Sequence, residues 1–177
     1  MIQRALRSLT ACLALAFAWT VPALAQSGPD DLASAIRDHP DLTVLADLLE
    51  DSGMMDDLEG GMRLTVFAPS DRAFERLDPE VRRILLRDRG ALDLILRHHI
   101  IAGAAPRAAL RRMDAVTTLE ATRLSLRVEG DEVRVDGTRL REGGTRAGSG
   151  MLYVVDRVLV PQRATSLKAL LTGPRSN

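Results

Sequence analysis

Apolar residues recur at helical spacing in the first half of the chain and at every second position in much of the second half. Leu42, Leu45 and Leu49 stand three and seven positions apart, which places them on one face of an α-helix. Leu124 and Leu126 alternate with polar residues, which is the period of a β-strand with one buried face. Helices followed by strands, rather than a regular alternation, predict an α+β domain.

Start and stop signals divide the helical half. Pro40 separates two helices, and we expect Asp41 to cap the second and Gly53 to end it. A short helical turn is predicted over 54–60. A further helix is predicted over 78–90, closed at its last glycine.

That helix has clear signals at both ends. Asp78 is a suitable N-cap, Pro79 fits the first helical position, and Gly90 is expected to end the helix. Residues 91–97 continue as a helix and then become extended, and a brief helix follows from Pro106.

Strands are predicted over 63–68, 124–128 and 151–161, the last closed by Pro161. Asp136-Gly137 predicts a two-residue type I′ hairpin turn, because both central residues need a positive φ. The glycine-rich segment 141–150 is expected to be a loop.

The segment LTVFAPSDRAFERL, residues 64–77, contains a strand that runs into a polar corner. Val66 and Phe67 should face opposite sides of the strand, which ends at a proline because proline has no N–H for a ladder. Ser70 or Asp71 is then expected to cap the helical turn that follows, and Phe74 to return that turn to the core. The corner therefore favours a structural role over an active site.

The amino-terminal residues have the pattern of a secretory signal. Arg4 and Arg7 precede an apolar run over 9–19, and small residues lead to a cleavage site after Ala25. An alternative is acylation at Cys12, although the apolar run follows that cysteine rather than preceding it. We predict a signal peptide over 1–25 and an exported protein, periplasmic or extracellular.

The remaining chain divides into a linker over 26–29, one domain over 30–161 and a tail over 162–177 that is expected to form a short helix. Cleavage leaves 22 basic and 24 acidic residues and removes the only cysteine. The exported domain therefore has neither a disulfide nor thiol chemistry.

Composition gives little sign of a charged partner. The formal net charge is +0 and 46% of the residues are hydrophobic, so we expect an ordinary globular domain and no nucleic-acid partner. Charge is unevenly spread, with ten acidic residues and one arginine over 30–59, and ten arginines and seven acids over 97–146. This indicates either a dipolar surface that orients a partner or simply the solvated faces of helices and strands.

Candidate chemistry is sparse. His98 and His99 are adjacent at a helix end and point in different directions, so they are not expected to bind one metal ion together. Asp156 lies in an apolar run and needs a partner for its carboxylate, or else marks a binding edge. Motifs for a serine hydrolase, a zinc protease and a P-loop are lacking, so we expect no catalytic residues, metal or cofactor.

Three segments together resemble the signatures of fasciclin-like domains. Residues 64–77 resemble the first signature, LILRHHIIAG at 94–103 the middle one, and MLYVVDRVLVP at 151–161 the last, in the family order. The resemblance implies a fasciclin-like fold, a twisted two-sheet β core with several helices packed around it. The residues that match the family signature, with structural roles implied, are Thr65, Phe67, Pro69, Asp71, Phe74, His99, Asp156 and Pro161. His98 and Gly144 depart from the family pattern, which usually has a tyrosine and an acid there.

The resemblance also implies a function. We expect an exported, non-catalytic module for adhesion or contact with cell-surface, matrix or envelope components, whose partner is a protein or a polysaccharide, with the membrane contacted only peripherally. In animal members an aspartate near Asp156 is implicated in receptor contact. The alternative is a periplasmic domain that binds a small apolar ligand between its helices and β core. An exposed apolar patch would favour the first function and an enclosed pocket the second.

Overall fold

The computed structural model of the protein describes residues 29–141 and 144–161. The predicted signal peptide, linker residues 26–28 and the predicted tail helix lie outside these residues. Within the described ranges, no helix combines the length and the apolar character that crossing a membrane requires.

In the described residues most helices lie in the first half and most strands in the second half, as the change from helical to alternating apolar spacing predicts. They are α1 (Leu32–Arg37), α2 (Thr43–Ser52), α3 (Met55–Glu59), α4 (Asp71–Glu75), α5 (Pro79–Leu85), α6 (Arg89–His98) and α7 (Arg107–Leu110). The strands are β1 (Leu64–Pro69), β2 (Ile100–Ala102), β3 (Ala115–Thr117), β4 (Arg123–Glu129), β5 (Glu132–Val135), β6 (Thr138–Arg139), β7 (Thr145–Ala147) and β8 (Gly150–Val155).

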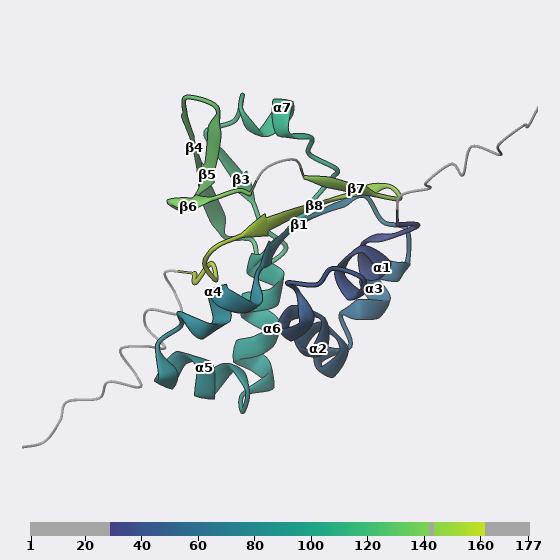
Figure 1. Ribbon diagram of the computed structural model, residues 1–177, viewed down its shortest axis with the longest axis vertical. Helices are drawn as coiled ribbons and strands as arrows, with labels where there is room; N and C mark the ends of the chain where they lie inside the picture. The colour runs from purple at the N-terminus through teal and green to yellow at the C-terminus, as the bar shows by residue number, and fades with distance from the viewer. Residues whose placement is uncertain (1–28, 142–143, 162–177) are drawn as a thin grey trace, which may run out of the picture.

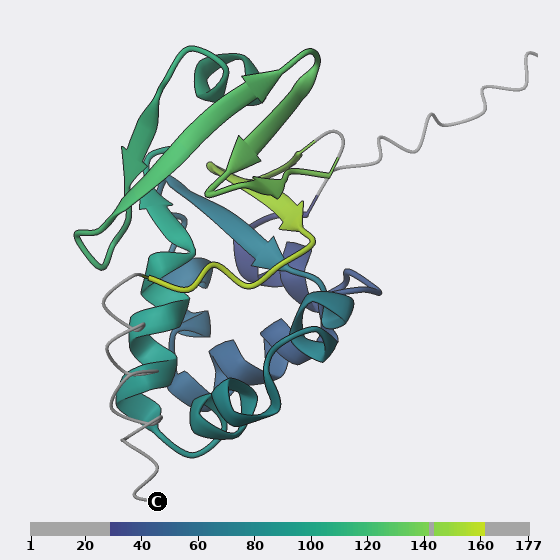
Figure 2. The same cartoon turned by 90° about the vertical axis from the view of Figure 1, so that its left-hand side faces the viewer.

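The strands form two four-stranded sheets, and a layer of helices packs on one side of them (Figures 1 and 2). The first sheet has the order β2-β1-β8-β7, and the second is the antiparallel meander β3-β4-β5-β6. Helices α1 to α6 cover the face of the first sheet that is turned away from the second. The predicted α+β fold with a two-sheet core is confirmed.

Strand β1 is buried on both faces, and its alternating side chains serve two separate cores. Val66 and Ala68 face the helices and join a cluster with Leu45 and Leu96. Phe67 faces the second sheet and packs in a cluster with residues of β4 and β5. All six residues of β1 are buried, as expected for a strand covered on both sides.

The two central strands are far apart in sequence but adjacent in space. Residues Thr65 to Pro69 of β1 pair in parallel with Met151 to Val155 of β8. Strand β2 adds antiparallel to the other edge of β1, and β7 adds antiparallel to β8. One ladder therefore holds together two segments that are far apart in the sequence.

Tyr153 anchors the interface between the sheets. Its ring lies 6.1 Å from that of Phe67 between ring centroids, and its hydroxyl donates to the Ala105 carbonyl at 2.9 Å. Gly144 stands against this ring with φ of +61°, and a Cβ at that position would lie 2.2 Å from the ring. The departure from the family pattern at Gly144 thus coincides with a position that has no room for a side chain.

Asp71 caps a helix, but not the one the sequence predicts. Its Oδ1 accepts from the Val44 amide at 2.9 Å and its Oδ2 accepts from the Thr43 hydroxyl at 2.8 Å, so it caps α2. The amide of Asp71 also donates to the Asp41 carbonyl at 2.8 Å. The predicted cap of α2 by Asp41 is wrong, because Leu42 occupies the N-cap and makes no side-chain bond.

The helical turn after β1 has no side-chain cap. Ser70 occupies the N-cap of α4 without capping it, and its buried hydroxyl has no hydrogen-bond partner in the described residues. The predicted capping of this turn by Ser70 or Asp71 is therefore wrong. The Asp71 carboxylate points instead toward a helix that precedes it by 27 residues.

Other boundaries differ from those predicted. Helix α5 ends at Leu85, and Gly90 lies near the start of α6, where its amide donates to the Asp88 cap. Strand β8 ends at Val155 rather than at Pro161. Part of the predicted glycine-rich loop forms β7, because its Thr145–Ala147 segment pairs with β8.

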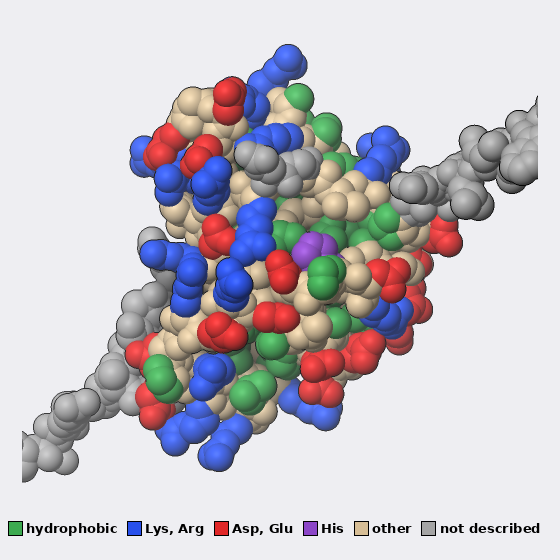
Figure 3. Space-filling view, viewed as in Figure 1, with side chains coloured by type: hydrophobic (Ala, Val, Ile, Leu, Met, Phe, Trp, Pro, Cys, Tyr) green, Lys and Arg blue, Asp and Glu red, His purple; other side chains and the backbone are tan. Residues whose placement is uncertain are grey.

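Charge is unevenly spread over the surface. Figure 3 shows acidic side chains gathered over α1, α2 and α3, whereas acidic and basic side chains are mixed over the β4–β6 region. Within the acidic region Arg37 pairs with Glu50 at 3.1 Å and with Glu59 at 2.7 Å, which ties the three helices together. Exposed pairs of this kind stabilise a fold only modestly.

We predict that Asp71→Ala lowers the free energy of unfolding by about 1 kcal/mol, because the amide at the start of α2 loses its acceptor. Urea denaturation followed by circular dichroism measures the change. Ser70→Ala is the matched control at the neighbouring position and should be neutral or slightly stabilising, since it removes a buried hydroxyl without a partner. Equal losses in the two variants would contradict the capping role of Asp71.

Candidate functional site

Most of the residues that match the family signature lie in the core or brace it. Thr65 is fully buried, and its hydroxyl donates to the Gly103 carbonyl at 2.7 Å and accepts from the Ala105 amide at 2.9 Å. Phe67 and Phe74 are buried in the two core clusters. These contacts hold β1 against the chain that follows β2, and they leave little of these side chains accessible to a partner.

His99 joins three segments inside the protein. Its Nδ1 lies 2.8 Å from the Ile95 carbonyl, and its Nε2 accepts from the Leu159 amide at 2.8 Å. Burial lowers the pKa of His99 from its ordinary 6.5 to about 4, so the ring is neutral. Nδ1 therefore carries the proton and donates to Ile95.

Asp156 finds its partner in an arginine rather than in its neighbour in sequence. Arg141 donates from Nε to Asp156 at 2.9 Å and from a terminal nitrogen to Asp41 at 3.1 Å. The carboxylates favour the charged guanidinium and raise the pKa of Arg141. This bridge connects the end of β8 with the segment between α1 and α2, and about a third of each side chain remains exposed at Asp156 and Arg141.

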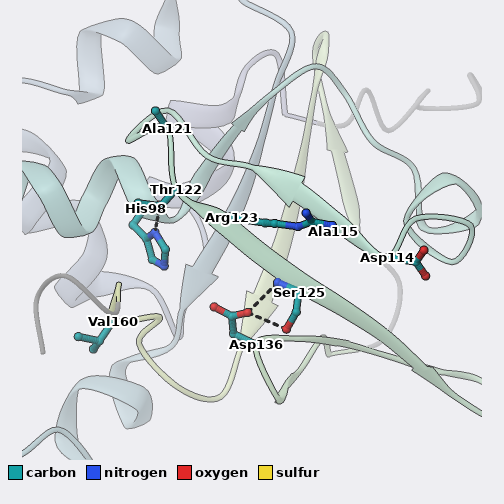
Figure 4. A pocket seen from close by; sticks show the side chains of 9 residues that line it. All are labelled: His98, Asp114, Ala115, Ala121, Thr122, Arg123, Ser125, Asp136 and Val160. Carbon is teal, nitrogen blue, oxygen red and sulfur yellow. Dashed lines mark hydrogen bonds between the residues drawn. The ribbon is translucent and has the colours of Figure 1, made fainter.

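A surface cavity is lined by a different set of residues. It has a volume of about 940 Å³ and lies beside the second sheet, where the end of α6, the loop before β4 and the segment after β8 approach one another (Figure 4). Its lining consists of His98, Asp114, Ala115, Ala121, Thr122, Arg123, Ser125, Asp136 and Val160. Polar groups therefore converge on a surface cavity that holds none of the signature residues.

The hairpin β4–β5 places Ser125 opposite Asp136. The register pairs Leu126 with Val135, and one step further Ser125 N and Oγ donate to Oδ1 of Asp136 at 2.7 and 2.8 Å. Asp136 has φ of +46° and Gly137 has φ of +77°, which agrees with the predicted type I′ turn. One aspartate thus shapes the turn and presents its carboxylate to the cavity.

His98 enters the cavity from the end of α6. Its Nδ1 lies 2.6 Å from the Thr122 hydroxyl, which in turn lies 2.8 Å from the Thr118 hydroxyl. The side chain is 2% exposed, and its Nε2 has no hydrogen-bond partner in the described part of the chain. Burial lowers the pKa of His98, and the negative charge of Asp136 acts in the opposite direction. The site is therefore a neutral imidazole that faces a carboxylate across a cavity (Figure 4).

Ser125, His98 and Asp136 are not arranged as a catalytic triad. Ser125 donates to Asp136 and not to His98, so the three residues do not form the hydrogen-bonded relay that activates a serine. The two histidine rings are nearly perpendicular, with centroids 6.4 Å apart. Across residues 29–141 and 144–161, no group of three potential metal ligands comes together.

Sequence reasoning identified His98 but not the residues that surround it. The β4–β5 hairpin turns at Gly130-Asp131, and its register places Ser125 opposite Asp136. The alternation of Leu124 and Leu126 with polar residues predicts only which face of the strand Ser125 occupies. The approach of His98 and Val160 to this hairpin depends on long-range packing that no local pattern encodes.

Comparison with known proteins agrees with the architecture. Residues 40–161 match the family model described as Fasciclin domain. A solved structure of a FAS1 domain pair from the insect cell adhesion molecule Fasciclin I superimposes with a TM-score of 0.53 at 22% identity, covering 67% of this chain and 44% of that one. This match concerns the fold.

Curated relatives come from bacteria and animals. The chain is 32% identical over 138 residues to the cell surface glycolipoprotein MPB83 of Mycobacterium bovis, covering 75% of this chain and 61% of that protein. It is also 32% identical over 117 residues to the transforming growth factor-beta-induced protein ig-h3 of Sus scrofa, covering 66% of this chain. The chain spans about three fifths of the first relative and 17% of the second.

We expect the folded protein to lose stability as the pH falls from about 6.5 to about 4. Unfolded His99 takes up a proton near its ordinary pKa of 6.5, whereas folded His99 does so only near 4, so acid favours the unfolded chain in this window. The shift corresponds to roughly 3 kcal/mol for His99 alone. Urea denaturation at a series of pH values measures the dependence.

His99→Gln should flatten this dependence while lowering stability at neutral pH. His39→Gln is the matched control, because His39 is only partly buried and lies at the surface between α1 and α2. It should keep the wild-type slope. An identical slope in wild type and His99→Gln would contradict the role of His99.

Proposed function

Because the chain belongs to the fasciclin domain family, we propose that it is an exported binding module that contacts a cell-surface, matrix or envelope component and performs no catalysis. The observation that carries this proposal is the match of residues 40–161 to the family, shared with a relative named as a cell surface glycolipoprotein. The structural match to a cell adhesion molecule, at 22% identity, concerns the fold and does not by itself support a function.

The geometry of the cavity fits a binding role. Its walls belong to a hairpin and a helix end that are anchored in the two cores, so its polar groups are held in place before a partner arrives. Pre-organised polar groups lower the entropic cost of binding. The serine, histidine and aspartate lack the connections of a hydrolase, which supports a module that binds without chemistry.

The alternative, a domain that captures a small apolar ligand, has less support. The large cavity is lined mainly by polar and charged side chains. Two smaller cavities of about 200 Å³ each carry charged residues in their walls, such as Asp51 and Arg89 in one and Asp41 and Arg141 in the other. The large hydrophobic side chains exposed in the described residues are distributed over several elements, and they include Met62, Leu86, Met113, Leu119, Val128 and Val160.

Export predicts a defined amino terminus. We expect the protein recovered from the periplasm or the medium of a producing bacterium to begin at Gln26, because the cleavage site follows Ala25. Intact-mass spectrometry of the purified protein measures this. A mass that retains Cys12 together with acyl chains would contradict signal cleavage and indicate a lipoprotein instead.

Surface contact predicts saturable binding to an envelope fraction. The fluorescently labelled exported protein should co-sediment with washed envelopes of the producing bacterium, and an excess of unlabelled protein should compete. Acid-unfolded and untreated samples of the same protein provide the control for nonspecific adsorption. Binding that does not saturate, or that the unfolded sample reproduces, would contradict the proposal.

A further inference from the structure

The Nε2 atom of His98 is an unusual feature of the cavity. The large majority of buried side-chain polar atoms in proteins have a hydrogen-bond partner, yet this nitrogen has none in the described residues. The ring is 2% exposed and points toward the space between Asp136 and Val160 (Figure 4). A ligand that enters the cavity can supply the missing partner.

Asp136 offers a complementary group on the opposite side. Both hydrogen bonds from Ser125 reach Oδ1, and Oδ2 receives none from the described residues. The Thr122 hydroxyl lies 2.6 Å from His98 Nδ1 and can donate to it, which leaves the ring proton on Nε2. In that tautomer the cavity carries an N–H donor on His98 and a carboxylate acceptor on Asp136.

A hydroxyl group matches this pair, because one oxygen accepts from Nε2 while its hydrogen is donated to Oδ2. The charges of the lining residues disfavour charged ligands. Asp114 and Asp136 outnumber Arg123, and His98 is neutral, so an anionic ligand is disfavoured. Since the described residues bring no third metal ligand to His98 and Asp136, a bound cation is also disfavoured.

The other lining residues can contact the remaining hydroxyl and C–H groups of a sugar. The hydroxyls of Ser125 and Thr122 and the guanidinium of Arg123 line the same cavity and can bond further ligand hydroxyls. The aliphatic surfaces of Ala115, Ala121 and Val160 can contact the C–H groups of a sugar ring. A volume of about 940 Å³ lies within the range of ligand-binding clefts.

We propose that this cavity binds a neutral saccharide, with one sugar hydroxyl bridging His98 Nε2 and Asp136 Oδ2. The inference rests on the proposed function, because it names the chemistry of the surface component that the module contacts. His98 stands where the resembling family usually has tyrosine, so the imidazole that makes the bridge is a departure of this chain from the family pattern.

The test uses the exported protein and a panel of methyl glycosides of glucose, galactose and mannose. Titrations followed by ¹H–¹⁵N NMR should show saturable shifts at residues of the cavity, with at least one glycoside in the millimolar range. The ring nitrogens of His98 should shift in the same titration, which a contact elsewhere on the surface would not produce.

Asp136→Asn is the decisive variant. Asn-Gly is favoured in a type I′ turn and Asn can still accept from Ser125, so the fold and its melting temperature should be retained. Its amide nitrogen then faces the cavity and cannot accept from the sugar, so the affinity should fall about tenfold or more. Asp131→Asn is the matched control, because it makes the same charge change in the exposed turn at the other end of the hairpin.

Four outcomes of these titrations would overturn the inference. These outcomes are the absence of shifts with every glycoside, unchanged affinity in Asp136→Asn, an equal loss in Asp131→Asn, and shifts at His98 produced by zinc ions but not by sugars. The envelope-binding experiment separates this inference from the proposed function. If Asp136→Asn still co-sediments with envelopes as wild type does, the module binds its surface partner elsewhere. The inference about a saccharide in this cavity is then wrong, and the proposed function stands.

Discussion

The parallel pairing of β1 with β8 places two strands in the middle of the domain, and β1 has no face toward water. Such strands require cover on both sides, because an exposed apolar face would cost much of the small net stability of a domain. The helices supply one cover and the second sheet the other. The cavity follows from this constraint, since the second sheet must lie over β1 while α6 runs beneath it, and their edges meet at His98.

Sequence reasoning succeeded where the physical signal was periodic or tied to one backbone conformation. The opposite facing of Val66 and Phe67 follows from the strand period, and the turn at Asp136-Gly137 follows from its need for positive φ. Reasoning failed where a side chain acts at a distance. Asp71 follows a strand and precedes a helical turn, so a local rule assigns it to that turn, although its carboxylate reaches α2. Gly90 looked like a helix end, but the nearby Asp88 begins a new helix.

The candidate site, too, could be predicted from the sequence only where local patterns specify it. The segments that resemble the family signature identified the fold, and most of their residues are used inside it, as His99 is between Ile95 and Leu159. Ser70 and His98, which have buried side-chain atoms without a partner in the described residues, lie inside the signature segments but are not among the residues that match the signature. The sequence fixes which side of the hairpin Ser125 occupies, but only tertiary packing determines that His98 faces Asp136. A motif that specifies a core therefore says little about the surface that the core supports.

The direction of the central strands has a mechanical consequence. Tension applied between residues 29 and 161 first loads α1 to α3, which precede β1 and of which α1 packs against β7 and β8; once they detach, it reaches β1 through its amino end and β8 through its carboxyl end. Because the two strands are parallel, such tension pulls them in opposite directions along their length and loads the hydrogen bonds of the ladder together. An antiparallel pair pulled from adjacent ends would open one bond at a time, like a zipper. The β1–β8 ladder is thus loaded in shear, with its hydrogen bonds sharing the load.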